Sequence, residues 1–246
     1  GHRITERLYS PTGKRVAIIG AGPAGVAAAH DLSLLGHDVV IFEREERPGG
    51  MLRYGIPEFR LPRDTLDIEL HNALRLGVQM RTGAEIGNGA EIGNGAGQIP
   101  MSKLEQDFDA VLLATGCMAA SPLPLQGEWE KRELHGLEGV EYGLDFLVQM
   151  HRGVKKTVGK RVAVVGAGFT ALDCARVAAR LGAQEVTIHI RTAEEYIPVT
   201  QEEIFEAKRE GVRIKGLRTP VGLTVEGNRL TGIEFVQNRL GGWRAG

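Results

Sequence analysis

One glycine-rich turn constrains the fold of this chain more than any other feature. The turn, GAGPAG at residues 20–25, follows the apolar run 15–19 and precedes residues 26–35, which favour a helix. Strand, glycine turn and helix in that order are typical of a dinucleotide-binding unit. Gly20 permits the tight turn, Gly22 lets backbone approach a pyrophosphate, and Gly25 lets the helix pack against the strand. The amino end of the helix then offers N–H groups and a positive dipole end to phosphates.

An acidic residue follows the next predicted strand. Residues 39–42 form an apolar run that ends in Glu43, 18 positions after Gly25. A carboxylate at this place is expected to accept hydrogen bonds from both ribose hydroxyls of a dinucleotide. Because strand, turn, helix, strand and acid agree, we favour a dinucleotide site over a glycine turn without a ligand.

The opening pattern returns 146 residues later. Residues 160–168 repeat the pattern of residues 14–22, and a second turn of GxGxxA type runs from residue 166 to residue 171. The next strand is expected over residues 185–190, where Ile190 stands in the place of Glu43. The repeat therefore implies two dinucleotide sites, the second without the ribose-binding acid. A single site with one decayed copy is the alternative.

Two Rossmann-like domains with parallel α/β sheets follow from this repeat, over residues 1–120 and 121–246. Around the two turns we predict helices over residues 64–76, 140–151 and 172–181, and strands over residues 78–81 and 108–113, the latter buried. The tandem copies of AEIGNG at residues 84–95 indicate a loop insertion or a hairpin tip. Residues 217–235 are expected to form short strands with turns at 227–228 and 231–232.

Composition excludes several functional classes. The net charge is −1 and there is no apolar run as long as a membrane span, so neither nucleic acid nor a membrane is indicated. We expect a cytoplasmic protein, because no signal-peptide pattern is present. Two cysteines, Cys117 and Cys174, cannot build a disulfide framework or an iron–sulfur cluster alone, and no CxxC pair occurs. We predict that Cys117 is a buried apolar residue rather than one near a cofactor, and the seven histidines show no metal-ligand spacing.

Two unlike dinucleotide sites indicate one tightly held flavin nucleotide and one exchangeable nicotinamide. The expected chemistry is hydride transfer from nicotinamide C4 to flavin N5, which the cofactors carry while the protein orients them. We therefore predict no catalytic side chain and no metal site.

A longer string narrows the family. The first turn, Glu43, the segment GGMLRYGIP at residues 49–57 and FRLP at residues 59–62 together resemble the flavoprotein family of the small subunit of NADPH-dependent glutamate synthase. The same module occurs in dihydropyrimidine dehydrogenase, in ferredoxin:NADP oxidoreductases and in flavin subunits of some iron–sulfur and tungsten enzymes. The resemblance covers nearly the whole chain.

The resemblance implies which residues hold the cofactors. FAD would lie on the first turn, with Glu43 on the adenosine ribose and Arg44 beside it, and the nicotinamide dinucleotide on the second turn. Arg191 matches the first of two basic residues that hold an NADP 2′-phosphate. The implied cofactor-binding residues are Gly20, Gly22, Pro23, Ala24, Gly25, Glu43, Arg44, Gly50, Met51, Leu52, Arg60, Thr115, Gly116, Gly166, Gly168, Phe169, Thr170, Ala171 and Arg191.

The chain departs from the family pattern at three points. Thr192 stands where a second basic residue is usual, whereas Ile190 removes the acid expected for NAD; between NAD and NADP we favour NADP. The family's cysteine-rich N-terminal domain is not in this sequence. Neither is the C-terminal Gly-Asp segment that completes the FAD site, so the FAD domain is expected to be incomplete.

The sequence thus favours an FAD-containing oxidoreductase subunit that passes hydride from NAD(P)H to FAD. Electrons would go on to iron–sulfur clusters or to a catalytic partner subunit. One alternative is a flavin subunit that exchanges electrons with a ferredoxin or an aldehyde-oxidising metalloenzyme. Another is a non-catalytic nucleotide-binding module, whereas the absence of CxxC disfavours a disulfide reductase.

Overall fold

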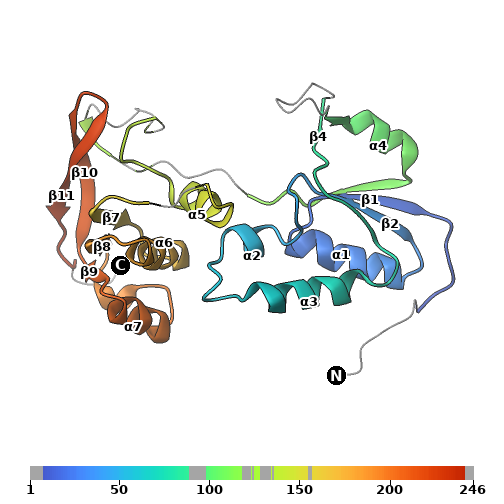
Figure 1. Ribbon diagram of the computed structural model, residues 1–246, viewed down its shortest axis with the longest axis horizontal. Helices are drawn as coiled ribbons and strands as arrows, with labels where there is room; N and C mark the ends of the chain where they lie inside the picture. Colours follow the sequence, from blue (N-terminus) through green and yellow to red (C-terminus); the bar gives the residue numbers. More distant parts are fainter. Residues whose placement is uncertain are drawn as a thin grey trace. The chain divides into compact units, whose positions relative to one another are not determined.

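The computed structural model divides the chain into two compact units, residues 1–117 and 118–246 (Figure 1). It describes residues 8–88, 98–117, 123, 125–127, 134, 136–154 and 157–241. Both units contain a parallel α/β sheet, as the repeat predicted. Each is described by itself.

Unit 1 is built on a four-stranded parallel sheet in the order β3-β2-β1-β6. The strands are β1 (Arg15–Ile19), β2 (Asp38–Phe42), β3 (Gln79–Arg81) and β6 (Ala110–Leu113). The register places Ile19 beside both Phe42 and Leu113, so three strands end at one edge of the sheet. Ligands of open α/β sheets bind at this carboxyl edge.

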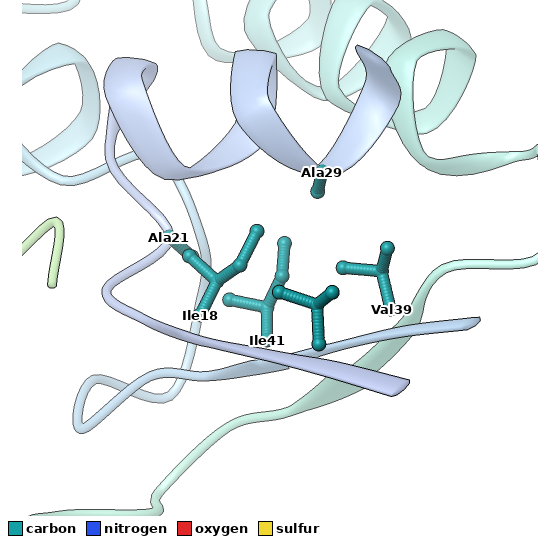
Figure 2. Close-up of a cluster of buried hydrophobic side chains, with 6 residues drawn as sticks. Ile18, Ala21, Ala29, Val39 and Ile41 are labelled. Atoms are coloured by element: carbon teal, nitrogen blue, oxygen red, sulfur yellow. The ribbon is translucent and has the colours of Figure 1, made fainter. Parts of the chain in front are cut away.

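Helices cover both faces of this sheet. The helices α1 (Pro23–Leu34) and α3 (Arg63–Leu74) pack on one face, and α4 (Met101–Asp107) packs on the other. Figure 2 shows Ala29 of α1 pointing at Ile18, Val39 and Ile41, all at most 2% exposed. Ala17, Val40 and Phe42 are buried on the opposite face, so β1 and β2 are apolar on both faces, as expected of buried parallel strands.

The segment after α4 differs from its prediction. The strand expected over residues 108–113 is shorter, and its end is exposed: 38% of Leu112 and 64% of Leu113 are accessible. The reason is position, because β6 lies at the edge of the described sheet with β1 as its neighbour. Cys117, predicted to be buried, is exposed.

Of the two forms predicted for the tandem repeat, the structure contradicts the hairpin tip, and the loop insertion stays a prediction. The strand β4 (Ile86–Gly87), in the first copy, pairs in parallel with β5 (Ile99–Pro100). A hairpin needs antiparallel strands, so the hairpin prediction is wrong. The whole second copy, residues 90–95, lies outside the described residues.

Unit 2 repeats the parallel layer with three strands in the order β7-β8-β9. The strands are β7 (Arg161–Val165), β8 (Glu185–His189) and β9 (Arg213–Lys215). The helix α6 (Phe169–Arg180) joins β7 to β8. The short helix η2 (Glu194–Tyr196) and the helix α7 (Gln201–Arg209) join β8 to β9. The helix α5 (Gly143–His151) packs on α6. It begins three residues later than predicted, because Val140 belongs to a turn in which its N–H bonds to the Leu137 carbonyl.

A long antiparallel hairpin completes unit 2. It consists of β10 (Arg218–Glu226) and β11 (Arg229–Gln237), with the predicted turn at Gly227-Asn228. The second predicted turn, at residues 231–232, is wrong: it lies inside β11. A register shift between Thr224 and Val225 keeps the strands paired there, and the Thr231 hydroxyl donates to the Thr224 carbonyl.

Candidate functional site

The first glycine turn is closely surrounded by backbone. Gly20 has φ of +108°, and a Cβ there would lie 2.4 Å from the Ala114 carbonyl oxygen. A Cβ at Gly25 would lie 2.0 Å from the Gly20 carbonyl oxygen, so only glycine fits either position. The helix α1 starts at Pro23 with Gly22 as its N-cap and no side-chain cap. Its first N–H groups therefore have no capping side chain and suit a phosphate.

Glu43 holds this turn in place. Its side chain is at the carboxyl end of β2 and is 7% exposed. One carboxylate oxygen accepts a hydrogen bond from the Ala21 N–H at 2.7 Å, and the other accepts one from the Glu45 N–H at 2.9 Å. An ionised carboxylate has about four acceptor sites, so these two bonds leave capacity for a ribose hydroxyl. The backbone bond to Ala21 is a role that sequence reasoning missed.

A second pair of glycines, Gly49 and Gly50, crosses the turn and is called the glycine strap. The Gly49 N–H donates to the Ala21 carbonyl at 2.8 Å, and a Cβ at Gly50 would lie 2.8 Å from the Gly22 Cα. Gly50 has φ of +50° and directly precedes the short helix α2 (Met51–Tyr54). The structure therefore brings Gly50 to the glycine turn, and Met51 and Leu52 follow it as the first residues of α2.

Two arginines that the sequence analysis left unassigned hold this strap. Arg53 is 5% exposed, donates to the Pro48 carbonyl and pairs with Asp67. Arg63 donates to the carbonyls of Leu52 and Ile56, both at 2.8 Å, and burial lowers the pKa of its guanidinium. Their signal was the presence of arginines in a glycine- and proline-rich segment, whose carbonyls need donors.

The other predicted residues of unit 1 lie after β6 or in the loops that follow β2 and α2. The Ala114 N–H donates to the Ile19 carbonyl at 2.9 Å, and the Thr115 Cα would lie 3.5 Å from a Cβ at Gly20. Thr115 is thus beside the turn, Gly116 follows it, and both are exposed. Arg44 is exposed and pairs with Glu45 at 3.4 Å, whereas Arg60, half-buried, lies in the loop before α3.

The second turn has the same backbone plan with more space. The Gly166 N–H donates to the His189 carbonyl at 3.2 Å, as the Gly20 N–H does to the Phe42 carbonyl at 2.8 Å. Gly168 is the N-cap of α6, has no side-chain cap, and a Cβ there would have no atom within 4 Å. The side chains of Phe169 and Thr170, the first two residues of α6, are exposed.

The strand ends confirm the equivalence of Glu43 and Ile190. The Glu43 N–H donates to the Arg81 carbonyl at 2.9 Å, and the Ile190 N–H donates to the Lys215 carbonyl at 3.0 Å. Ile190 is 1% exposed, so its side chain is in the core. Arg191, the next residue, is exposed, and its carbonyl accepts a hydrogen bond from Asn238 at 2.7 Å.

An aromatic pair lies at the same strand end. The His189 ring stacks on Phe235 with centroids 4.1 Å apart and an angle of 14° between the planes. Burial, followed by the charges of Lys215 and Arg218, lowers the pKa of His189. Sequence reasoning missed these four residues, because three of them are on strands that come later in the chain.

The two cysteines are in different units and different surroundings. The Cys174 thiol donates to the Gly143 carbonyl at 3.3 Å, and burial raises its pKa to about 12.

Among the described residues, there is no group of three or more His, Cys, Asp or Glu side chains that could hold a metal ion. In the same part of the chain, no helix is long and apolar enough to cross a membrane.

Comparisons with known proteins agree with this geometry. The profile of the pyridine nucleotide-disulphide oxidoreductases matches residues 14–238. The chain is 39% identical over 237 residues to the NADP(+)-dependent formate dehydrogenase subunit beta of Moorella thermoacetica, covering 96% of this chain and 32% of that protein. It is 34% identical over 242 residues to the glutamate synthase [NADPH] small chain of Escherichia coli, covering 94% and 48%. The predicted resemblance to the glutamate synthase small subunit is thereby confirmed.

Solved structures share the fold at lower identity. FprA of Mycobacterium tuberculosis, in complex with NADPH, superposes with a TM-score of 0.74 at 19% identity, over 95% of this chain and 65% of that chain. The thioredoxin reductase of Lactococcus lactis gives a TM-score of 0.60 at 21% identity, over 91% and 71%. The chain spans between about a third and about half of the length of the curated relatives cited above. On its sequence and its fold, it belongs to the pyridine nucleotide-disulphide oxidoreductase family.

Proposed function

We propose that this chain is the flavoprotein part of an electron-transfer oxidoreductase, with FAD on unit 1 and NADPH or NADH on unit 2. One observation carries the proposal: two equivalent glycine turns lie at the carboxyl edges of two parallel sheets, and only the first has an acid at the next strand end. Two unlike dinucleotide sites suit a resident cofactor and an exchangeable one.

The residues around the first turn fit an FAD. The uncapped start of α1 and the glycines at positions 20, 22 and 50 leave the backbone accessible to a pyrophosphate. Glu43 has acceptor capacity left for the adenosine ribose. Arg44, Met51, Leu52, Arg60, Thr115 and Gly116 are proposed as further contacts.

The second turn fits a nicotinamide dinucleotide. The uncapped start of α6 and the open space at Gly168 favour a pyrophosphate there, with Phe169, Thr170 and Ala171 beside it. Arg191 is proposed to contact the adenosine end of the dinucleotide. Some relatives are named for NADP(+) or NADPH, which supports NADP, whereas the PreT subunits of Salmonella, 34% identical, are named NAD-dependent.

The protein's part in the reaction is binding and orientation. The two bound cofactors would supply hydride transfer from the reduced nicotinamide to the flavin and onward electron transfer. The chain's residues hold each dinucleotide by backbone N–H groups and fix the first turn through Glu43. We propose no side-chain acid, base or metal ion for this transfer.

A partner subunit is proposed as the electron acceptor. Relatives are a subunit beta and a small chain, which are named as parts of larger enzymes. We propose that the acceptor carries iron–sulfur clusters or the catalytic site. Whether it resembles glutamate synthase, a ferredoxin or an aldehyde-oxidising metalloenzyme stays open, and cytoplasmic location stays a prediction.

The test uses the intact native protein with its co-purifying subunits. We expect a flavin absorbance spectrum that bleaches when NADPH is added without oxygen. A purified protein that carries no flavin and does not take up added FAD would contradict the proposal. Nucleotide binding without bleaching would instead support the non-catalytic module.

A further inference from the structure

Three cationic residues gather at the carboxyl edge of the sheet in unit 2. The parallel register places Val165, His189 and Lys215 in one row across β7, β8 and β9. The glycine turn starts directly after Val165, so this is the edge where a dinucleotide would bind. Arg191 follows two residues after His189, and Arg218 begins β10 three residues after Lys215.

Backbone hydrogen bonds fasten the segment 215–218 along the segment 190–192. The Ile190 N–H donates to the Lys215 carbonyl at 3.0 Å, the Arg218 N–H to the Ile190 carbonyl at 2.8 Å, and the Leu217 N–H to the Thr192 carbonyl at 2.8 Å. Arg218 and Lys215 therefore flank the backbone that leads into Arg191.

The approach is close and locally strained. A Cβ at Gly216 would lie 3.2 Å from the Thr192 carbonyl oxygen, so a larger residue would push the segments apart. Leu217 has φ of +56°, a conformation that non-glycine residues seldom adopt. Asn238 adds a clamp, because its amide donates to the Arg191 carbonyl and to the Thr219 hydroxyl.

The charges of these cations are not neutralised within the described part of the chain. There, neither Arg191 nor Lys215 nor Arg218 has an ion pair with a carboxylate, and Glu194, in the same loop as Arg191, pairs with Lys208. Burial, followed by the charges of Lys215 and Arg218, lowers the pKa of His189, in keeping with the place of both residues at this strand end. Ile190 adds no negative charge where Glu43 stands in unit 1.

We infer that Lys215 and Arg218 complete, with Arg191, a binding site for the 2′-phosphate of NADPH, and so favour the phosphorylated dinucleotide. This inference rests on the proposed function, in which unit 2 binds NAD(P)H. Sequence reasoning found one basic residue, Arg191, followed by Thr192 where the family usually has a second basic residue. In the structure, the further cations come from the neighbouring strand and the turn after it. The 2′-phosphate of NADPH can accept charge-assisted hydrogen bonds from several cations. The neutral 2′-hydroxyl of NADH forms only weaker bonds with the same residues.

The test measures two small ligands that differ by this phosphate. Adenosine 2′,5′-bisphosphate and adenosine 5′-monophosphate are titrated into the intact protein by calorimetry. We expect Lys215→Met and Arg218→Met each to weaken the bisphosphate by about tenfold, the scale of one lost charged hydrogen bond. The monophosphate should change by less than about twofold, since it has no 2′-phosphate. Methionine keeps the aliphatic stem, and thermal unfolding checks that each variant folds.

Arg161→Met is the matched control. Arg161 is exposed and begins β7, so its substitution removes one charge from the amino edge of the same sheet. The affinity for neither ligand should change. Equal losses for both ligands, or no loss in either variant, would overturn the inference and leave the proposed function standing. If the unmutated protein binds neither ligand, the nicotinamide site of unit 2 fails, and the inference fails with it.

Discussion

The two glycine turns share a plan but differ in how closely backbone surrounds them. In the first turn, a Cβ at Gly20, Gly25 or Gly50 would lie within 2.8 Å of a backbone atom. In the second, Ala171 carries a real Cβ at the place of Gly25, and Gly168 has no atom within 4 Å of its Cβ position. The first turn is thus fixed by the protein on two sides, whereas the second is open. This difference suits a resident cofactor in unit 1 and an exchangeable one in unit 2.

The strand ends differ in the same direction. In unit 1, the Glu43 carboxylate binds the backbone of its own turn, and Arg81 lies over the Phe42 ring at 5.3 Å. In unit 2, the equivalent residues are Ile190, Lys215 and His189, and the ring of His189 stacks on Phe235 instead. Unit 1 therefore uses its acid to hold the turn, and unit 2 keeps cations at an edge without an acid.

Gly25→Ala is expected to have the largest effect. Its Cβ would lie 2.0 Å from the Gly20 carbonyl oxygen, so the turn must move, at a cost of about 3 kcal/mol or more in the free energy of unfolding of unit 1. Hydrogen exchange of β1 and α1, with flavin absorbance, measures it. The matched control is Ala171→Gly, which should cost about 1 kcal/mol in unit 2 through helix propensity. Equal costs would break the comparison of the turns.

Glu43→Gln ranks next. The amide loses the charge and keeps only one oxygen for the N–H groups of Ala21 and Glu45, so we expect unit 1 to lose about 2 kcal/mol and to release flavin more readily. The measurement is denaturant unfolding together with flavin dissociation. The control at the equivalent place is Ile190→Val, which should cost about 1 kcal/mol and leave flavin unaffected. Unchanged flavin retention in Glu43→Gln would contradict the proposed role.

The third prediction concerns the stability of unit 2 at low pH. Burial disfavours the ionised form of Glu210, but hydrogen bonds from Arg180 and Arg176 outweigh it and lower the pKa of the carboxyl to about 2, from an ordinary value of 4.5. A lowered folded pKa means that this stabilisation is fully present above pH 4.5 and is lost as the pH falls through 2. We expect α6 and α7 to lose about 2 kcal/mol of stability over that window, after allowance for partial exposure.

Hydrogen exchange of α6 and α7 between pH 5 and pH 2.5 tests this prediction. Glu210→Gln should be less stable at pH 6 and should depend less on pH over the window. The helix α1 of unit 1 has His30 at the place of Arg176, so it serves as an internal reference. An identical acid dependence in the variant would rule out Glu210 as the cause.

The smallest effect is a difference in thiol reactivity. Cys117 of unit 1 is exposed, whereas Cys174 of unit 2 is buried with a pKa raised to about 12. Iodoacetamide at pH 7.5 should label Cys117 in the native protein and reach Cys174 only in denaturant, because the thiolate is the reactive form. Mass spectrometry of the labelled peptides gives both yields. Native labelling of Cys174 at a similar rate would mean that α5 and α6 open readily.

Much of the fold could be predicted from local patterns. Apolar runs, glycine turns and helix-forming segments located β1, α1, β2 and their copies, since these signals depend on neighbours in sequence. The predictions that failed depended on surroundings instead. Leu113 is exposed because β6 lies at an edge of the described sheet, and residues 231–232 stay in β11 because the partner strand absorbs the shift.

The candidate site was predictable in part for the same reason. The glycines and Glu43 follow a fixed spacing within one βαβ unit, so sequence alone pointed to them. Arg53 and Arg63 were missed because their partners are carbonyls of an irregular loop. Lys215 and Arg218 were missed because they meet Arg191 only through the pairing of β8 with β9 and the turn that follows.

Local sequence patterns were enough to locate two strand–turn–helix units, each with a glycine-rich turn, and to show that only the first is followed by an acid. These are properties of residues a few positions apart, whose geometry the backbone fixes locally. Three features came only from the folded chain: how tightly each turn is enclosed, the hydrogen bond from Ala21 to Glu43, and the cations from β9 and β10 beside Arg191. These depend on which segments, distant in sequence, the sheets bring side by side, and no local spacing encodes that neighbourhood.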